Sequence, residues 1–128
     1  MEPDKVPGPA DKAGVRLGTL NVQNLPLVFD DVVALIKEHQ LDALALQEVN
    51  LRTTERAHYR SRFDREGLRV CYSKPDPKGI IVTAIVGIDI NQHDLPLEAF
   101  DYRCSWCTIK AAGVMCIFGC IYAFSYLS

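Results

Sequence analysis

The sequence has almost no excess of charge of either sign, since its 14 lysines and arginines are set against 16 aspartates and glutamates. The formal net charge of −2 gives no long-range attraction for nucleic acid, so a polyanion would have to be met by local basic groups or a bound cation. The apolar segment of a secretory signal is also missing, because residues 1–14 are polar and contain three prolines. We therefore expect a disordered leader over residues 1–14 and a soluble intracellular protein, in the cytoplasm or the nucleus.

Cysteine occurs five times, and without a secretory signal an odd number is typical of reduced thiols. Two pairs, Cys104 with Cys107 and Cys116 with Cys120, imitate the spacing of zinc ligands. However, residues three apart on a strand point to opposite faces, and the neighbours of these cysteines are apolar. Buried structural thiols are therefore favoured over a zinc site.

Set against these absences, 48% of the 128 residues are hydrophobic, which is enough for one domain with a core. The short apolar run Ala43–Leu46 is typical of a strand buried on both faces, as in a parallel sheet covered by helices. Gln47 and Glu48 then interrupt it. A carboxylate at the end of a buried strand is costly unless a cation meets it, and this edge of an open α/β sheet is where ligands bind.

A second strand and a helix precede this run. Val15–Val22 reads as a strand, and an apolar stripe at helical spacing then predicts a helix that ends at His39. With Leu41–Glu48 as the next strand, the segment forms a β-α-β unit whose strands are parallel and joined by a right-handed crossover. Asn21 and Glu48 end these two strands, so we expect them to lie side by side at one edge of the sheet.

A carboxylate beside a neutral amide suits a hard divalent cation. Mg²⁺ takes one or two carboxylates and completes its shell with water and phosphate oxygens, and such an ion could polarise a phosphoryl group. From the residues alone, Asn21 serves equally well as a turn former and Glu48 as a solvated strand end. The two interpretations remain open at this point.

The rest of the chain predicts mostly antiparallel strands, and hence an α/β protein with a mixed β-sheet and flanking helices. Its basic segment, Arg52–Glu66, is expected to be a loop followed by a solvated helix capped by Thr53 or Thr54, although its five arginines also suit phosphate. The expected strands are Leu68–Tyr72, Ile80–Ile88, Phe100–Lys110 and Val114–Ala123, separated by a loop at Lys74–Gly79, a break at Asn91–Glu98 and a hairpin turn at Ala111–Gly113.

The last eighteen residues, 111–128, carry no charge, and this is the length at which a membrane helix becomes conceivable. β-branched residues and two glycines favour instead a central strand that is covered on both sides, because residues of both parities are apolar. A tail anchor is the alternative. We expect a further element to cover so apolar a strand.

Several of these stretches resemble a known family, the endonuclease/exonuclease/phosphatase superfamily with the DNase I-like fold. Within that superfamily, the resemblance is strongest to the endonuclease domain of LINE-type retrotransposons. The opening resemblance lies in Thr19–Leu25 and Asp42–Glu48, which match the family's T-x-N-V and L-Q-E pieces in order and spacing. The supporting pieces are Glu48–Leu51, with Asn50 at a His position, Gly79–Val82, and Cys120–Phe124, with Phe124 in place of a proline.

The resemblance implies half of a four-layer α/β sandwich over residues 15–128. It also implies a Mg²⁺-dependent nuclease or phosphodiesterase that acts on nucleic acid or another phosphodiester. Carried over residue by residue, Glu48 would be the Mg²⁺ ligand, Asn21 its neighbour near metal and phosphate, and Tyr122 the tyrosine that contacts the reacting phosphate.

Two later family motifs, G-D-x-N and S-D-H, have no counterpart in the sequence. Asp89-Ile90-Asn91 spells D-x-N but precedes Tyr122 instead of following it, and His39, His58 and His93 stand in other contexts. We therefore expect the N-terminal portion of such an enzyme, truncated and inactive alone. The alternatives are a non-catalytic binding or scaffold module of the same fold, and a small tail-anchored membrane protein.

Overall fold

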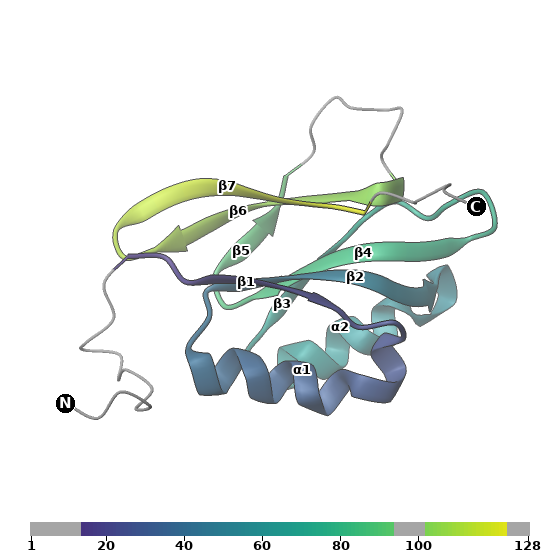
Figure 1. Ribbon diagram of the computed structural model, residues 1–128, viewed down its shortest axis with the longest axis horizontal. Helices are drawn as coiled ribbons and strands as arrows, with labels where there is room; N and C mark the ends of the chain where they lie inside the picture. Colours follow the sequence, from purple (N-terminus) through teal and green to yellow (C-terminus); the bar gives the residue numbers. More distant parts are fainter. Residues whose placement is uncertain (1–13, 94–101, 123–128) are drawn as a thin grey trace.

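The computed structural model describes residues 14–93 and 102–122, which form three layers: two helices, a four-stranded sheet and a three-stranded sheet (Figure 1). The elements in chain order are β1 (Leu17–Asn21), α1 (Leu25–His39), β2 (Ala43–Arg52), a 3-10 turn (Thr53–Glu55), α2 (Arg56–Arg65), β3 (Arg69–Tyr72), β4 (Ile80–Gly87), β5 (Ile90–Gln92), β6 (Cys104–Ala111) and β7 (Val114–Ile121). The leader expected over residues 1–14 lies, but for its last residue, outside the described residues.

The first sheet has the strand order β1-β2-β4-β3. β1 and β2 are parallel, whereas β4 runs antiparallel to both β2 and β3. The predicted β-α-β unit with a parallel pair is therefore confirmed, and the sheet is mixed as expected. Asn21 is the register partner of Gln47, so Glu48 is the next residue along the neighbouring strand.

Both helices pack on one face of this sheet. α1 buries five apolar side chains there, among them Phe29, as its stripe predicts. The expectation that α2 is fully solvated is wrong for one face, because Tyr59 and Phe63, four residues apart, are buried. The ring centroids of Phe29 and Phe63 are 4.6 Å apart, and the Arg62 guanidinium lies 3.9 Å from the centre of the Phe29 ring.

The predicted threonine cap of this helix is also wrong. Thr53 and Thr54 belong to the 3-10 turn, and Glu55 stands at the N-cap of α2 without a capping side-chain bond. The carboxylate of Glu55 instead accepts the backbone N–H of Arg52 at 2.9 Å. The acidic residue therefore stabilises the turn that leads into the helix.

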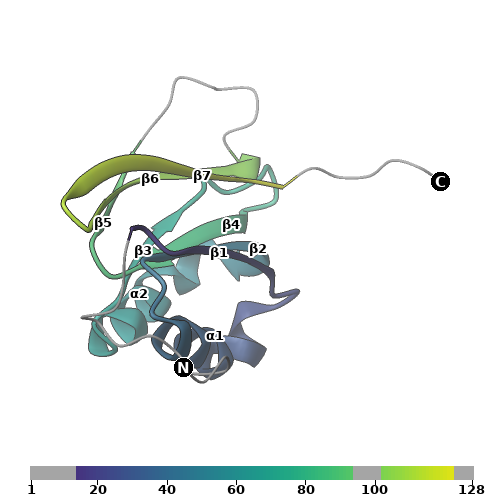
Figure 2. The same ribbon diagram turned by 60° about the vertical axis from the view of Figure 1, so that its left-hand side comes forward.

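The second sheet has the order β5-β6-β7 and is antiparallel throughout. It covers the face of the first sheet that is turned away from the helices (Figure 2). The break expected at Asn91–Glu98 is wrong at its start, because Asn91 and Gln92 pair with β6; residues 94–101 lie outside the described residues. The core between the sheets consists of Ala43, Ala45, Cys71, Ile85, Ile90, Cys107, Ile109 and Cys120.

β7 corrects a further expectation. The strand is present, as predicted, but it forms the edge of the second sheet and has an exposed face, whereas a central strand covered on both sides was expected. Within the described residues the layer that would cover it is absent, so three layers of the expected four are seen. None of the helices in the described residues is long and apolar enough to cross a membrane.

Four of the five cysteines are buried thiols, and Cys116 is partly exposed. All five lie in the described part of the chain and none forms a disulfide. Cys107 is in the core between the sheets, where burial raises its pKa to about 12. Among residues 14–93 and 102–122, no three His, Cys, Asp or Glu side chains gather as metal ligands.

Candidate functional site

An irregularity in β2 sets the direction of Glu48. Leu44 and Leu46 belong to the core on the helix side of the sheet, yet so do Val49 and Leu51, so the parity of the strand changes between them. Gln47 is opposite Thr83 and Leu51 is opposite Ile81, and the three residues between them on β2 thus face a single residue of β4. A bulge of this kind re-aims a side chain.

The bulge is built from residues in an uncommon conformation. Glu48 has φ 55° and Asn50 has φ 52°, both in the left-handed region. For a residue other than glycine this costs about 1–2 kcal/mol, and such strain persists only where the surrounding structure imposes it. Here the side chain of Asn50 imposes it in part, since its Nδ2 donates to the carbonyl of Gln23 at 2.5 Å.

As a result, Glu48 meets the second sheet instead of the helices. The hydroxyl of Tyr122 donates a hydrogen bond of 2.7 Å to Oε1 of Glu48, across 74 residues of sequence. Tyr122 directly follows β7, and its backbone N–H donates to the carbonyl of Arg103 at 2.9 Å. The hydrogen bond to Glu48, then burial and then the negative charge of Glu48 raise the pKa of Tyr122, so its phenol stays protonated at neutral pH.

Asn21 lies at the end of β1, beside this pair. Its Oδ1 accepts the backbone N–H of Gln23 at 3.1 Å, and Gln23 is itself left-handed with φ 60°. Asn21 is exposed and therefore accessible to a ligand. Asn21 therefore acts as a turn former, and as the register partner of Gln47 it lies one position from Glu48 along β2. The expectation that Glu48 also ends its strand is wrong, because β2 continues to Arg52.

The side chain of Gln47, which was not predicted as part of the site, forms hydrogen bonds next to these residues. Nε2 of Gln47 donates to Oγ1 of Thr19 at 2.9 Å and contacts Sγ of Cys120 at 3.2 Å, so it joins β1, β2 and β7. Burial raises the pKa of Cys120, and the hydrogen bond from Gln47 lowers it by a smaller amount. The position of Gln47 directly before Glu48 could have indicated that it belongs to the site. Its partners, Thr19 and Cys120, could not be predicted because they lie in distant segments of the chain.

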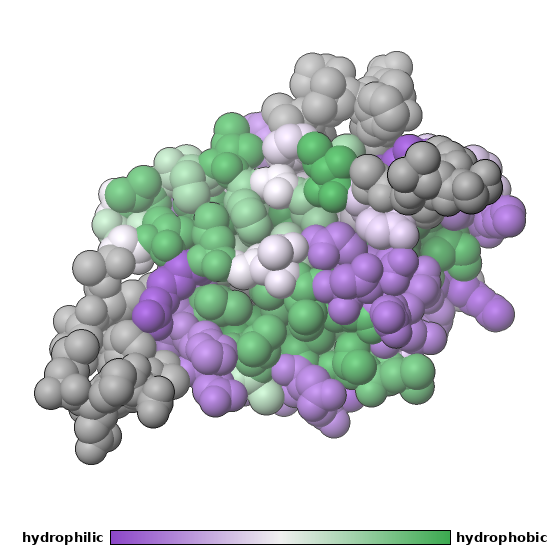
Figure 3. Space-filling view, in the orientation of Figure 1, coloured by the Kyte–Doolittle hydropathy of each residue, from purple (hydrophilic) through white to green (hydrophobic). Residues whose placement is uncertain are grey.

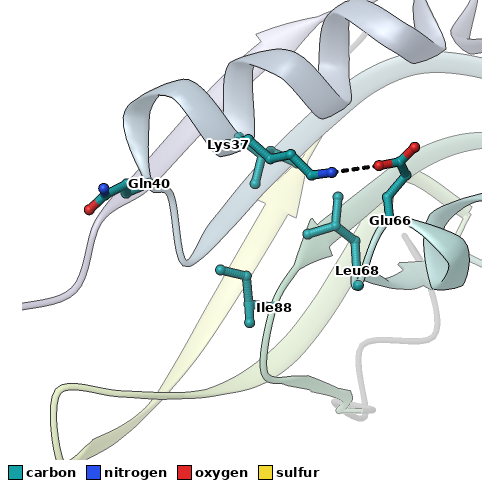
Figure 4. A pocket seen from close by; sticks show the side chains of 7 residues that line it. Lys37, Gln40, Glu66, Leu68 and Ile88 are labelled. Carbon is teal, nitrogen blue, oxygen red and sulfur yellow. Dashed lines mark hydrogen bonds and ion pairs between the residues drawn. The ribbon is translucent and has the colours of Figure 1, made fainter. Parts of the chain in front are cut away.

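Two of the pockets formed by the described residues are relevant for their charged rims, and both lie away from Glu48. One, of about 400 Å³, is formed by apolar side chains that include Leu68 and Ile88, with an ion pair of 2.5 Å between Lys37 and Glu66 at its rim (Figure 4). It sits at the other end of the sheet, since the N–H of Ile88 donates to the carbonyl of Asp42 at the start of β2. The second, of about 280 Å³, has its rim formed by Arg60 and Arg69 and other polar residues between α2, β3 and β5.

The donor set around Glu48 fits Mg²⁺ and not a metal held by protein alone. One carboxylate and one amide are enough for an ion that keeps water and phosphate oxygens in its shell. A structural metal site needs a larger set, and none exists among the described residues. The histidines lie elsewhere: His39 ends α1, the ring of His58 stands edge-on to Tyr59, and the backbone N–H of His93 donates to the carbonyl of Trp106.

Comparison with solved structures places the fold. An AP endonuclease from Archaeoglobus fulgidus superposes with a TM-score of 0.57 at 23% identity, over 81% of this chain and 40% of that one. The endonuclease domain of TRAS1, a telomere-specific non-LTR retrotransposon, gives 0.58 at 14% identity, over 86% and 46%. The 3′-5′ exonuclease NExo from Neisseria meningitidis gives 0.53 at 25% identity, over 77% and 38%.

These structures share the DNase I-like fold, and the resemblance read from the sequence is therefore confirmed at the level of the fold. The chain spans less than half the length of each of the three. No protein-family model matches the chain, and a search of curated proteins finds no match either.

Proposed function

We propose that this chain supplies the metal-binding side of a Mg²⁺-dependent nuclease or phosphodiesterase centre, with Glu48 as the metal ligand and Asn21 and Tyr122 beside it. The observation that carries the proposal is the 2.7 Å hydrogen bond from Tyr122 to Glu48. Three separate motifs of the resemblance named Asn21, Glu48 and Tyr122, and the fold gathers two of them in contact and the third on the adjoining strand.

Each side chain has a distinct part in this centre. Glu48 would hold the ion through Oε2, because Oε1 already accepts the tyrosine hydroxyl. Tyr122 stays protonated at physiological pH, so its hydroxyl can donate a hydrogen bond to a phosphate oxygen. The amide of Asn21 can orient the same phosphate or a water. When bound, Mg²⁺ would polarise the phosphoryl group and neutralise charge on the leaving oxygen.

We also propose that the chain is the N-terminal portion of such an enzyme and is inactive alone. A general base oriented by a carboxylate contributes several powers of ten to the rate, and the motifs that would supply one, G-D-x-N and S-D-H, are not in the sequence. The chain covers less than half of each solved structure that matches. Their names describe enzymes of nucleic acid, which supports nucleic acid as the substrate class.

Metal binding is the first test. Titration of the ¹⁵N-labelled chain with Mg²⁺ should move the amide resonances of residues 47–50 and 122 in the wild type, and these shifts should be lost in Glu48→Gln. Glu66→Gln is the matched control, because Glu66 is an acid at the opposite end of the sheet, paired with Lys37. Equal Mg²⁺-induced shifts in the wild type and in Glu48→Gln would exclude Glu48 as the metal ligand.

Cleavage is the second test. With Mg²⁺ and a duplex containing an abasic site, the chain should bind DNA in a Glu48-dependent manner but give no product above the Glu48→Gln background. Cleavage that Glu48→Gln abolishes would overturn the claim of inactivity while keeping the site. DNA binding that ignores both Mg²⁺ and Glu48 would favour the non-catalytic binding module.

A further inference from the structure

A small polar cleft lies between α2, β3 and β5, which stand one above another at the left in Figure 2. Its volume is about 280 Å³. Arg60 and Asp64 line it from α2, Arg69 from β3, and Asn91 and Gln92 from β5. We call it the arginine cleft.

The lining of the arginine cleft differs from that of the other surfaces of the molecule. The larger pocket of about 400 Å³ is mostly apolar, and its lysine is already paired with Glu66. In Figure 3 the hydrophobic colour gathers over the part of the molecule where β7 lies in Figure 1. The arginine cleft has charged and amide groups at its rim instead, so it suits a polar, charged ligand.

The two arginines of the cleft have no acidic partner among the described residues. Neither Arg60 nor Arg69 forms an ion pair there. Asp64 lies one helical turn after Arg60 and lines the same cleft, but it is paired with neither arginine in this part of the chain. The cleft therefore has an excess of positive charge. Two like charges at one small cleft repel each other, and a bound anion would relieve that repulsion.

Both guanidinium groups are also held in place. Nη1 of Arg69 donates a hydrogen bond of 3.1 Å to Oδ1 of Asn91, which joins β3 to β5. The guanidinium of Arg60 lies over the ring of Tyr72, 5.5 Å from its centre. Tyr72 is buried, and its hydroxyl donates to the carbonyl of Arg56 at 3.2 Å, so the ring is fixed beneath the charge. Donors that are already ordered lose less entropy when a ligand binds.

We propose that the arginine cleft binds a small phosphate-bearing anion between Arg60 and Arg69. The fork of a guanidinium matches two oxygens of a phosphate, and hydrogen bonds between such charged groups are strong. Asn91 adds a donor, because its Oδ1 accepts from Arg69 and its Nδ2 is left for the anion. Drug-sized sites begin at roughly 300 Å³, so the cleft holds a phosphate group with a small substituent.

The arginine cleft is remote from Glu48. Arg69 is the register partner of Gly87, and Gly87 is the register partner of Ala43, the first residue of β2. Glu48 is five residues further along that strand, which is about 16 Å at roughly 3.3 Å per residue. A ligand in the cleft therefore does not touch Glu48, and this proposal is independent of the proposed function.

Titration of the full ¹⁵N-labelled chain with inorganic phosphate tests the site. The ionic strength is kept low and constant, because salt screens exposed charges. The side-chain Nε–Hε resonances of Arg60 and Arg69, and the amide resonances of residues 90–92, should shift and saturate together. We expect a dissociation constant on the order of 1 mM, since the ligand is small and the arginines are exposed.

Substitutions at the cleft should change the affinity for phosphate in both directions. Arg60→Gln and Arg69→Gln should each weaken binding at least fivefold. Arg65→Gln is the matched control, because it removes the same charge from an exposed position of α2 outside the cleft, and it should change binding less than twofold. Asp64→Asn should tighten binding at least twofold, because it removes a negative charge from the cleft. All four side chains are exposed, so the fold should tolerate these changes.

Two further probes distinguish the source of the phosphate. Adenosine monophosphate that binds at least as tightly as a single-stranded oligothymidylate identifies a free small ligand. Tighter binding of the oligothymidylate identifies a phosphate carried on a strand. Either result supports the site only if Arg60→Gln weakens the binding of the preferred probe.

Other results overturn the proposal. Shifts that do not saturate by 20 mM phosphate exclude a site of this kind. An equal loss of affinity in Arg65→Gln and Arg60→Gln would show a general effect of surface charge. Unchanged affinity in Asp64→Asn would place the anion outside the cleft. Phosphate affinity should be the same in Glu48→Gln as in the wild type, so the cleft and the Mg²⁺ site can fail separately.

Discussion

Glu48 is the residue at which local energetics and the candidate function conflict. A β-strand would keep this residue extended, but its φ of 55° directs the carboxylate toward Tyr122. Left-handed residues other than glycine are uncommon, and at candidate sites the strain they hold is a reason to suspect function. The conflict can be measured, because stability and metal binding should respond to Glu48 in opposite directions.

Replacement of Glu48 by glycine and by alanine separates the two effects. Glu48→Gly should be more stable than Glu48→Ala by about 1 kcal/mol, because glycine adopts a positive φ without a steric cost, and both variants should lose Mg²⁺ binding. Urea unfolding measures the difference. At Asp31, an exposed position inside α1, the order should reverse, with glycine less stable than alanine by up to about 1 kcal/mol. The same order at both positions would contradict a strained Glu48.

The acidity of Tyr122 tests the contact with Glu48. The carboxylate favours the protonated phenol, so the pKa of Tyr122 lies above its ordinary value of 10.0. The hydrogen bond thus stabilises the fold fully below pH 10 and less as pH rises through the raised pKa. In Glu48→Gln this pKa should fall, and a difference titration of tyrosinate absorbance against the background Tyr122→Phe measures it. An unchanged pKa would mean that the contact is not formed in solution.

At the scale of the element, α2 shows how two residues decide the role of a helix. Its sequence is strongly basic, and a solvated helix is the natural interpretation of such a segment. Tyr59 and Phe63 nevertheless bury one face against Phe29 of α1, and Arg62 packs its guanidinium on the same ring. Only the arginines on the remaining face are left to contact water or a phosphate.

Truncation of Phe63 measures this packing. Phe63 is fully buried, so Phe63→Ala should lower the free energy of unfolding by about 3–5 kcal/mol, whereas Arg65→Ala, at an exposed position on the same helix, should change it by less than about 0.5 kcal/mol. Chemical denaturation followed by circular dichroism gives both numbers. Because Phe63→Ala could unfold a marginal domain, Phe63→Leu provides a milder loss. Equally small effects of the substitutions at Phe63 and Arg65 would mean that α2 is fully solvated after all.

At the scale of the whole molecule, the two sheets meet through a core that contains cysteine. Cys107 is fully buried between the sheets, and Cys120 is buried beside it. Burial disfavours the thiolate and raises the pKa of both groups, that of Cys107 from 9.0 to about 12. In the unfolded chain these thiols would ionise near their ordinary pKa, so alkaline pH favours the unfolded chain and destabilises the fold.

Stability should therefore fall as pH rises above 9. Between the ordinary and the raised pKa the unfolded chain binds fewer protons than the folded chain, so the free energy of unfolding decreases with pH. We expect a loss of at least about 1 kcal/mol between pH 9 and pH 11, since one pKa unit corresponds to about 1.4 kcal/mol. Urea unfolding under reducing conditions measures it, and Cys107→Ala should flatten the dependence. An identical slope in the wild type and this variant would place its origin elsewhere.

The local pattern was sufficient for the segment up to Glu48. Apolar spacing predicted β1, α1 and the first part of β2, and the geometry of a parallel β-α-β unit had to bring Asn21 near Glu48. The end of β2 was predicted wrongly, because the strand was expected to end at Glu48 but continues through its bulge to Arg52. The later strands were predicted in place, but their division into two sheets was not. That division depends on which faces find partners, and β5 is too short to stand out by periodicity.

The sequence by itself determined most of the elements and the parallel pair, since these follow from local periodicity, and its resemblance to a known family named the candidate residues. Only the tertiary structure decided that a bulge turns Glu48 away from the helices, that Tyr122 reaches it across 74 residues, and that β7 is an exposed edge. The reason is physical: the direction of a side chain at a bulge and the covering of an apolar face depend on distant segments, which local propensity does not contain.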